Sequence, residues 1–210
     1  MDVQTSLSTD LAEKIRIEIL SERLRPGAKI TELSLSRMFG VSRTPVREAL
    51  KNLDTEGLID MIPNRGAFVV GLSMDDLKDL YALRTSAEVQ AVRWAVERRT
   101  ADEMEGIEES LDFMIFYTER GDTKRMRSIN AGFHRKIALA SHCRIVIDDL
   151  FRMQEYIRYS IRIKPYRADE LADILREHQA IFTAFKASDP EAGAAAMHTH
   201  IQNSLTRANL

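Results

Sequence analysis

The sequence predicts a mainly α protein in which a winged helix-turn-helix precedes a six-helix bundle. Between residues 31 and 70, a helix, a tight turn, a second helix and two short strands follow one another closely. From Ser73 onward, capping residues separate six helical segments, and no segment has the alternating pattern of a strand. We therefore expect two domains, residues 1–72 and residues 73–210.

Three helices are expected in the N-terminal domain. The first covers residues 10–23, where apolar residues recur on one face. Thr31 caps the second helix, and Gly40 reverses the chain at its end. Ser42 is placed to cap the third helix, which makes this segment a helix-turn-helix.

A two-stranded wing is expected to complete this domain. Residues 59–62 and 67–70 are apolar segments, and the Pro-Asn-Arg-Gly turn of residues 63–66 joins them. Packing of the wing against the helices predicts a small core. The expected core residues are Leu50, Leu53, Leu58 and Ile62.

Six helices are expected in the C-terminal domain. Thr100 with Glu103, Asp122, and Asp189 followed by Pro190 have the pattern of helix starts. The expected helices cover residues 74–98, 100–121, 122–142, 144–163, 169–187 and a last segment from residue 189 onward.

Charge and composition restrict the functional classes. The net charge is −2, but the segment 37–51 carries four cations against one anion, so a basic patch is expected on one face only. The single cysteine, Cys143, excludes an internal disulfide and fits a reducing cytoplasm. No apolar run approaches the length of a membrane span. We expect a cytoplasmic protein with no membrane partner.

The third helix has the pattern of a DNA-reading helix. Arg43 and Arg47 are one turn apart and can contact a guanine edge and phosphates. The wing tip suits the minor groove. A solvated, charged helix face is the alternative. Because one winged helix makes few contacts, a homodimer on a palindromic operator in double-stranded DNA is expected. The expected DNA-contacting residues are Arg37, Ser42, Arg43, Thr44, Arg47, Arg65 and Gly66.

A second group of residues lies in the C-terminal helices. Asn130 and His134 share one helix face, while His178 and His200 lie in two later helices. Imidazoles from three antiparallel helices can meet in a bundle and bind a divalent ion. By spacing alone, a histidine inside a helix is more often hydrogen-bonded or exposed than a ligand.

The run Val-Ser-Arg-Thr-Pro-Val-Arg-Glu-Ala-Leu of residues 41–50, together with this histidine pattern, resembles the GntR family of bacterial transcription regulators. The C-terminal half resembles the FCD effector domain of its FadR-type members, with the length of the VanR group. The resemblance implies a bound divalent transition metal, Zn or Ni first, with Asn130 replacing the usual Asp. The implied metal ligands are Asn130, His134, His178 and His200.

The resemblance also implies a small organic acid as effector. Arg84 lies four residues before Glu88, so the pair is either an ordinary ion pair within one helix or part of an effector site. Arg158 and Arg162, with Tyr159 between them, are expected either to add donors to that site or to form a solvated face.

These features predict a transcription repressor that is not an enzyme and whose operator affinity depends on the acid and the metal. A regulator that senses the metal ion itself is one alternative. A metal-dependent hydrolase is another. Against the hydrolase, the sequence has no His-Glu-x-x-His motif and no nucleophile elbow, and Glu177 is expected to face away from the metal.

Overall fold

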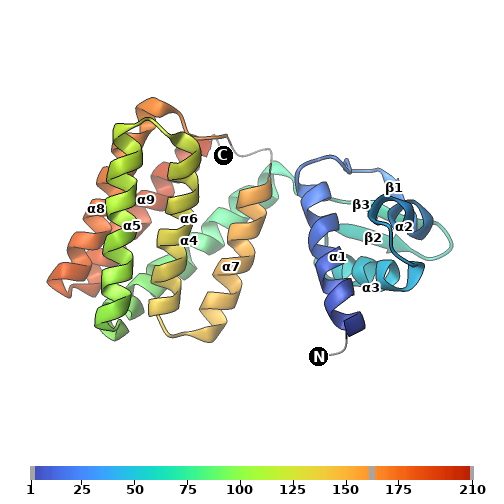
Figure 1. The fold of residues 1–210 in the computed structure, drawn as a ribbon, viewed down its shortest axis with the longest axis horizontal. Helices are drawn as coiled ribbons and strands as arrows, with labels where there is room; N and C mark the ends of the chain where they lie inside the picture. The colour runs from blue at the N-terminus through green and yellow to red at the C-terminus, as the bar shows by residue number, and fades with distance from the viewer. Residues whose placement is uncertain (1–2, 161–163, 209–210) are drawn as a thin grey trace. The chain divides into compact units, whose positions relative to one another are not determined.

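The computed structural model describes residues 3–160 and 164–208. Two compact units are present among the described residues, one comprising residues 3–73 with 159–160 and one comprising residues 74–158 and 164–208 (Figure 1). Among the described residues, no helix is both long enough and apolar enough to span a membrane.

The first unit is a winged helix-turn-helix. Its helix α1 begins at Val3 and ends at Leu20, earlier at both ends than predicted. The chain reverses there because Glu22 adopts a positive φ of 54° and Leu24 donates its N–H back to Glu18 O at 2.9 Å. The other elements of this unit are β1 (Lys29–Ile30), α2 (Glu32–Phe39), α3 (Arg43–Thr55), β2 (Ile59–Ile62) and β3 (Gly66–Val69).

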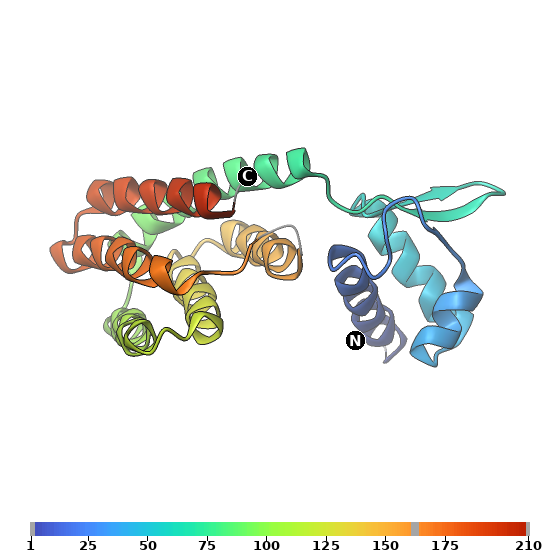
Figure 2. The ribbon, with the colours of Figure 1, turned by 90° about the horizontal axis from the view of Figure 1, so that it is seen from above.

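The sheet has three strands in the order β1-β3-β2, so the prediction of a two-stranded wing was incomplete. Lys29 pairs with Phe68, and Ile30 pairs with Ala67. A two-residue strand has no detectable periodicity, which is why the sequence did not reveal β1. The β2–β3 hairpin extends away from the helices of its unit (Figure 2).

Three of the four residues expected in the core of this unit are buried, namely Leu50, Leu53 and Leu58. The prediction for Ile62 was wrong, because its side chain is 37% exposed. Only the first residue of β2 is buried, since the far end of a two-stranded hairpin has no second layer to pack against.

The helix-turn-helix geometry follows from its caps. Thr31 and Ser34 form a reciprocal capping box at the start of α2. Gly40 takes the left-handed conformation, with φ 66°, at the reversal. Ser42 occupies the cap position of α3, but its side chain makes no capping hydrogen bond, which corrects the prediction.

The second unit has the six predicted helices. Thr100 caps α5, Asp122 caps α6, and Asp189 accepts hydrogen bonds from the first turn of α9. Helix α7 ends at Tyr159, and residues 161–163 of the predicted helix lie outside the described residues. The helices are α4 (Met74–Arg98), α5 (Ala101–Glu119), α6 (Thr123–Ala140), α7 (Arg144–Tyr159), α8 (Leu171–Ala187) and α9 (Pro190–Ala208), with a 3₁₀ turn at Ala168–Glu170.

Helix α9 lies along α4 and α8 (Figure 2). Gly193 permits this close approach. A Cβ at this position would lie 2.7 Å from Val92 Cγ1 on α4 and 3.5 Å from Ala184 Cβ on α8. The three helices therefore meet where α9 has no side chain, and this contact sets the spacing of α9, which carries His200, against α8, which carries His178.

We expect Gly193→Ala to lower the free energy of unfolding by about 1–3 kcal/mol, because a buried valine must move to admit the methyl group. Gly106→Ala is the matched control, since its Cβ would be no nearer than 3.9 Å to a flexible lysine. That change should raise stability by about 0.5–1 kcal/mol. Denaturant unfolding of both variants tests this prediction, which fails if Gly193→Ala is as stable as Gly106→Ala.

Candidate functional site

Three histidines from three helices meet inside the six-helix unit. His134 on α6, His178 on α8 and His200 on α9 are at most 2% exposed. Each offers one ligand nitrogen, and these atoms all lie within 4.8 Å of one another. Nε2 of His134 is 3.1 Å from Nε2 of His200. Asn130 Oδ1 is 2.6 Å from Nε2 of His178. The structure thus brings together all four residues that the sequence indicated.

Hydrogen bonds at the outer Nδ1 atoms set the tautomer of each ring. A carbonyl or carboxylate oxygen can only accept, so each Nδ1 must carry the proton. Each Nε2 then directs its lone pair toward the centre of the cluster. The outer acceptors are Ile174 O for His178 at 2.6 Å, a Glu88 oxygen for His134, and Glu177 Oε2 for His200 at 2.8 Å.

This donor set fits a divalent transition metal. Asn130 donates its Nδ2–H to the Tyr166 hydroxyl, which leaves Oδ1 facing the Nε2 of His178. The lone pairs of Asn130 Oδ1 and the histidine Nε2 atoms therefore face one another with no proton between them. A bound cation would stabilise that arrangement. Burial lowers the pKa of His178 well below its usual value. Burial also lowers the pKa of His200 to about 4, so both rings are neutral at pH 7 and can bind a metal.

Two hydrogen-bonded Arg–Glu–His triads contact the outer nitrogens of the cluster. In the first, Arg84 Nε donates to Glu88 Oε1 at 2.6 Å, and the other Glu88 oxygen accepts from His134. All three side chains are buried. Burial by itself raises the pKa of Glu88, but the charge of Arg84 and the hydrogen bonds from His134 and Arg84 hold it well below the usual range. Glu88 is thus an ionised carboxylate that orients a ligand ring.

The second Arg–Glu–His triad, formed by Arg207, Glu177 and His200, was not predicted from the sequence. Arg207 donates to both oxygens of Glu177, at 2.9 and 2.7 Å, and Asn203 adds a third hydrogen bond. Although burial opposes the shift, hydrogen bonds from Arg207 and His200 lower the pKa of Glu177 to about 2. Glu177 contacts the outer nitrogen of His200 and not the centre. Its partners Asn203 and Arg207 lie three and seven residues after His200, a spacing that puts all three on one helix face.

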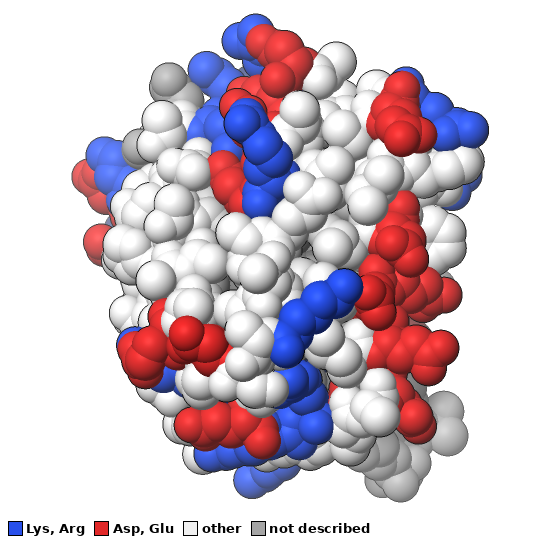
Figure 3. Space-filling view, turned by 90° about the vertical axis from the view of Figure 1, so that its left-hand side faces the viewer, with Lys and Arg blue, Asp and Glu red and all other residues white. Residues whose placement is uncertain are grey.

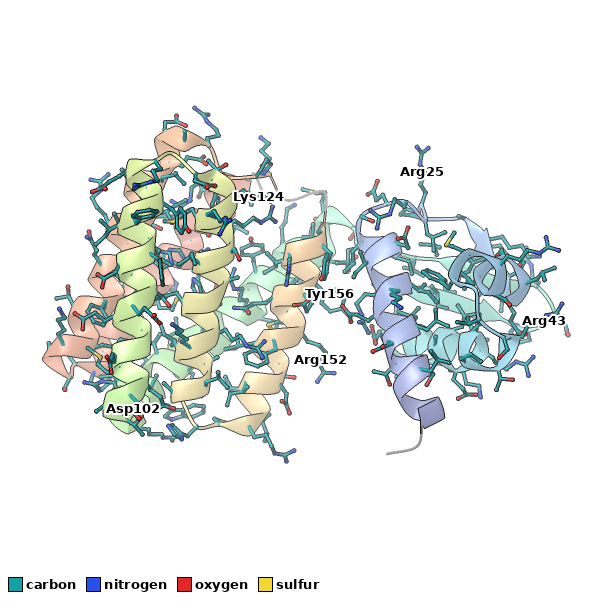
Figure 4. All side chains as sticks on the ribbon, in the orientation of Figure 1. Arg25, Arg43, Asp102, Lys124, Arg152 and Tyr156 are labelled. Atoms are coloured by element: carbon teal, nitrogen blue, oxygen red, sulfur yellow. The ribbon has the colours of Figure 1, made fainter. Side chains whose placement is uncertain are left out.

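A cavity of about 790 Å³ reaches this cluster from one side. It runs beside α6 from Lys124 to Arg135, and Figure 4 labels Lys124. Arg84, at 6% exposure, lines it together with Asn130 and His134. The predicted effector residue Arg158 also lines the cavity but is exposed, whereas Arg162 lies outside the described residues.

The residues expected to contact DNA lie on the surface of the first unit. Arg43 begins α3 (Figure 4), and Arg47 follows one turn later. Arg47 is held by Glu32, with its Nε 2.7 Å from Oε1 and its Nη2 2.9 Å from Oε2. The hydrogen bond from Arg47 lowers the pKa of Glu32, and the charge of Arg43 adds to the shift. Arg37, Ser42, Thr44, Arg65 and Gly66 are also exposed.

Two family models match this chain. Residues 7–69 match the bacterial regulatory proteins of the gntR family, and residues 79–203 match the FCD domain. The second match alone covers more than half of the chain.

Related sequences and solved structures agree with these matches. The chain is 29% identical over 206 residues to the uncharacterized HTH-type transcriptional regulator YdhC of Bacillus subtilis, covering 97% of this chain and 91% of that protein. It is 27% identical over 191 residues to the HTH-type transcriptional repressor RspR of Escherichia coli, covering 90% and 82%. The solved structure of E. coli McbR/YncC superposes with a TM-score of 0.72 at 22% identity, covering 100% and 98% of the two chains. This last similarity shows the shared fold.

Proposed function

The chain belongs to the GntR family of bacterial regulatory proteins and is a DNA-binding transcriptional regulator, and we propose that a small carboxylate bound beside a metal ion controls its affinity for DNA. One relative is named a repressor. We take the same polarity for this chain, with repression relieved when the carboxylate binds.

Asn130, His134, His178 and His200 would hold the metal. Their nitrogen and oxygen donors suit Zn or Ni. Four donors leave room for an additional ligand, and the ion would supply an electrophile for one carboxylate oxygen of the effector.

The observation that carries the proposal is the position of Arg84. This buried guanidinium lines the same cavity as Asn130 and His134, and it is linked to His134 through Glu88. An arginine binds a carboxylate with two parallel hydrogen bonds. A carboxylate in the cavity can therefore contact Arg84 and, through Glu88, affect the orientation of a ligand ring.

The DNA half of the proposal rests on α3 and the wing. Arg43 and Arg47 are exposed one turn apart, and a homodimer would present two such helices to a palindromic operator. Binding of the effector would reorient helices of the six-helix unit and change the separation of the two recognition helices. Such a coupling requires the carboxylate to have different affinities for the two arrangements.

The contacts of Glu88 and Glu177 favour a regulator over a hydrolase. Each of these carboxylates, the acidic groups that touch the histidines, is already bound by an arginine and a histidine. Neither has the freedom to serve as a general base for a metal-activated water.

Thermal unfolding tests the site. Chelator-stripped protein is titrated first with Zn²⁺ or Ni²⁺ and then, with metal present, with small carboxylic acids. At one hundred times the dissociation constant, a ligand stabilises the native state by about 2.7 kcal/mol, a rise in melting temperature of roughly 5–10 °C. We expect the metal effect to vanish in His134→Ala and the acid effect to vanish in Arg84→Ala.

Measuring operator affinity under the same conditions distinguishes a regulator that senses a carboxylate from one that senses the metal ion itself. If the acid changes operator affinity only when metal is present, the proposal holds. If metal alone changes it and no acid adds to the effect, the chain is a metal sensor. A melting temperature that no metal changes would contradict the proposed site.

A further inference from the structure

The cavity beside the histidines is strongly basic. Among the described residues that line it, eight are lysine or arginine and two are glutamate. Glu170 accepts from the Arg167 backbone N–H at 2.8 Å, and Glu155 lies 3.9 Å from Arg158. The lining cations are Arg84, Lys124, Arg125, Arg127, Arg135, Arg158, Lys164 and Arg207.

This positive charge is local to the cavity. Helix α5 of the same unit carries seven acidic residues and no lysine or arginine. Figure 3 shows acidic side chains along one edge of an outer face, and acidic and basic ones intermixed elsewhere on it. The cations in the cavity therefore do not reflect a uniformly basic domain, and their concentration around one hollow indicates an anionic ligand.

Two of these cations precede Asn130 on α6, on the side away from His134 along the helix. Lys124 lies in the first turn of α6, at the positive end of the helix dipole, where a lysine is unfavourable, and Arg127 follows in the second turn. Neither makes an ion pair with a carboxylate within the described ranges. Arg127 is half-buried, and its charge acts on the Tyr81 and Tyr166 hydroxyls that line the same cavity.

In the proposed function, the metal ion and Arg84 together bind one carboxylate group of the effector. Imidazole and amide ligands carry no charge when they bind a metal, so they would leave the full double charge on a bound divalent ion. The two carboxylates behind the rings are each paired with an arginine. Arg127 precedes Asn130 by three residues and Lys124 precedes it by six, which is about 4.5 and 9 Å of helix rise.

We propose that the effector is an acid with two anionic groups, of which the second binds Lys124 and Arg127. This inference rests on the proposed function, because the first group binds beside Arg84 at the histidine site. The helix rise from Asn130 to these two cations matches a short acyclic dicarboxylate of about four to six carbons. A monocarboxylate bound at the histidine site would leave Lys124 and Arg127 without an anionic partner.

Calorimetric titration of the metal-loaded protein with two matched pairs of acids tests this inference. Butyrate differs from succinate by one carboxylate, as hexanoate differs from adipate. We expect at least one dicarboxylate to bind about tenfold or more tightly than its partner. In Lys124→Gln/Arg127→Gln, that gain should disappear while monocarboxylate binding persists.

The control variant is Arg144→Gln/Arg152→Gln, which removes the same charge from exposed positions on α7 outside the cavity (Arg152 is labelled in Figure 4). It should keep the preference for the dicarboxylate. Equal affinity within both pairs, or a preference that survives in Lys124→Gln/Arg127→Gln, overturns the second subsite. The proposed function stands in that case if binding still depends on metal and Arg84. Failure of all four acids to bind metal-loaded protein overturns both.

Discussion

Replacing Arg43 and Arg47 with alanine should abolish specific operator binding. A bidentate contact between an arginine and a base is worth about 1–3 kcal/mol, and a dimer on a palindrome would lose two arginines from each protomer. The expected loss is at least about 4 kcal/mol, roughly a thousandfold in affinity. Fluorescence anisotropy with a labelled operator at fixed salt measures it, and the dependence of affinity on salt should weaken as well.

The structure offers a closely matched control for this experiment. Arg23 is exposed in the same unit and is held by Glu18 through two hydrogen bonds of 2.7 and 2.8 Å, as Arg47 is held by Glu32. Arg23→Ala therefore removes a similar ion pair and should leave operator affinity nearly unchanged. Retention of tight operator binding by the Arg43→Ala/Arg47→Ala variant would show that α3 does not read the DNA.

His200→Ala should remove most of the metal affinity. Outer partners of metal ligands are typically worth about 10–100-fold in affinity, so loss of a ligand should cost more than about a hundredfold. His198→Ala is the control on the same helix, because His198 is exposed whereas His200 is 1% exposed. The measurement is metal affinity of chelator-stripped protein by competition with a chromophoric chelator.

A third variant separates ligation from folding in this experiment. Glu177→Gln keeps the size of the side chain that accepts from His200 Nδ1 but removes its charge. We expect an intermediate loss of metal affinity, with an unfolding transition that remains cooperative. If His200→Ala folds and binds metal as tightly as His198→Ala, the three histidines are structural.

Much of the fold could be predicted because its signals are local. Thr31, Gly40, Thr100 and Asp122 mark helix ends through contacts within three or four residues, and each was found at the expected cap or reversal. The missed strand β1 and the exposure of Ile62 depend on contacts with other parts of the chain, whereas the missing Ser42 cap is a local error. Strand β1 exists only because β3 pairs with it.

The sequence alone determined the chemistry of the candidate site. Imidazole, amide and guanidinium groups at residues 84, 130, 134, 178 and 200 are properties of the chain, and helical periodicity placed each on a helix face. Apart from Glu88, the helical neighbour of Arg84, the sequence could not provide the partners of these groups.

Only the tertiary structure decided which side chains complete the site. Glu177 on α8 contacts His200 on α9, and Lys124 and Arg127 share one cavity with Arg84. These relations depend on how far one helix is shifted and rotated against the next, which is set by close packing at positions such as Gly193. Helical periodicity specifies the face on which a residue lies, but the packing of side chains from distant segments specifies what that face meets.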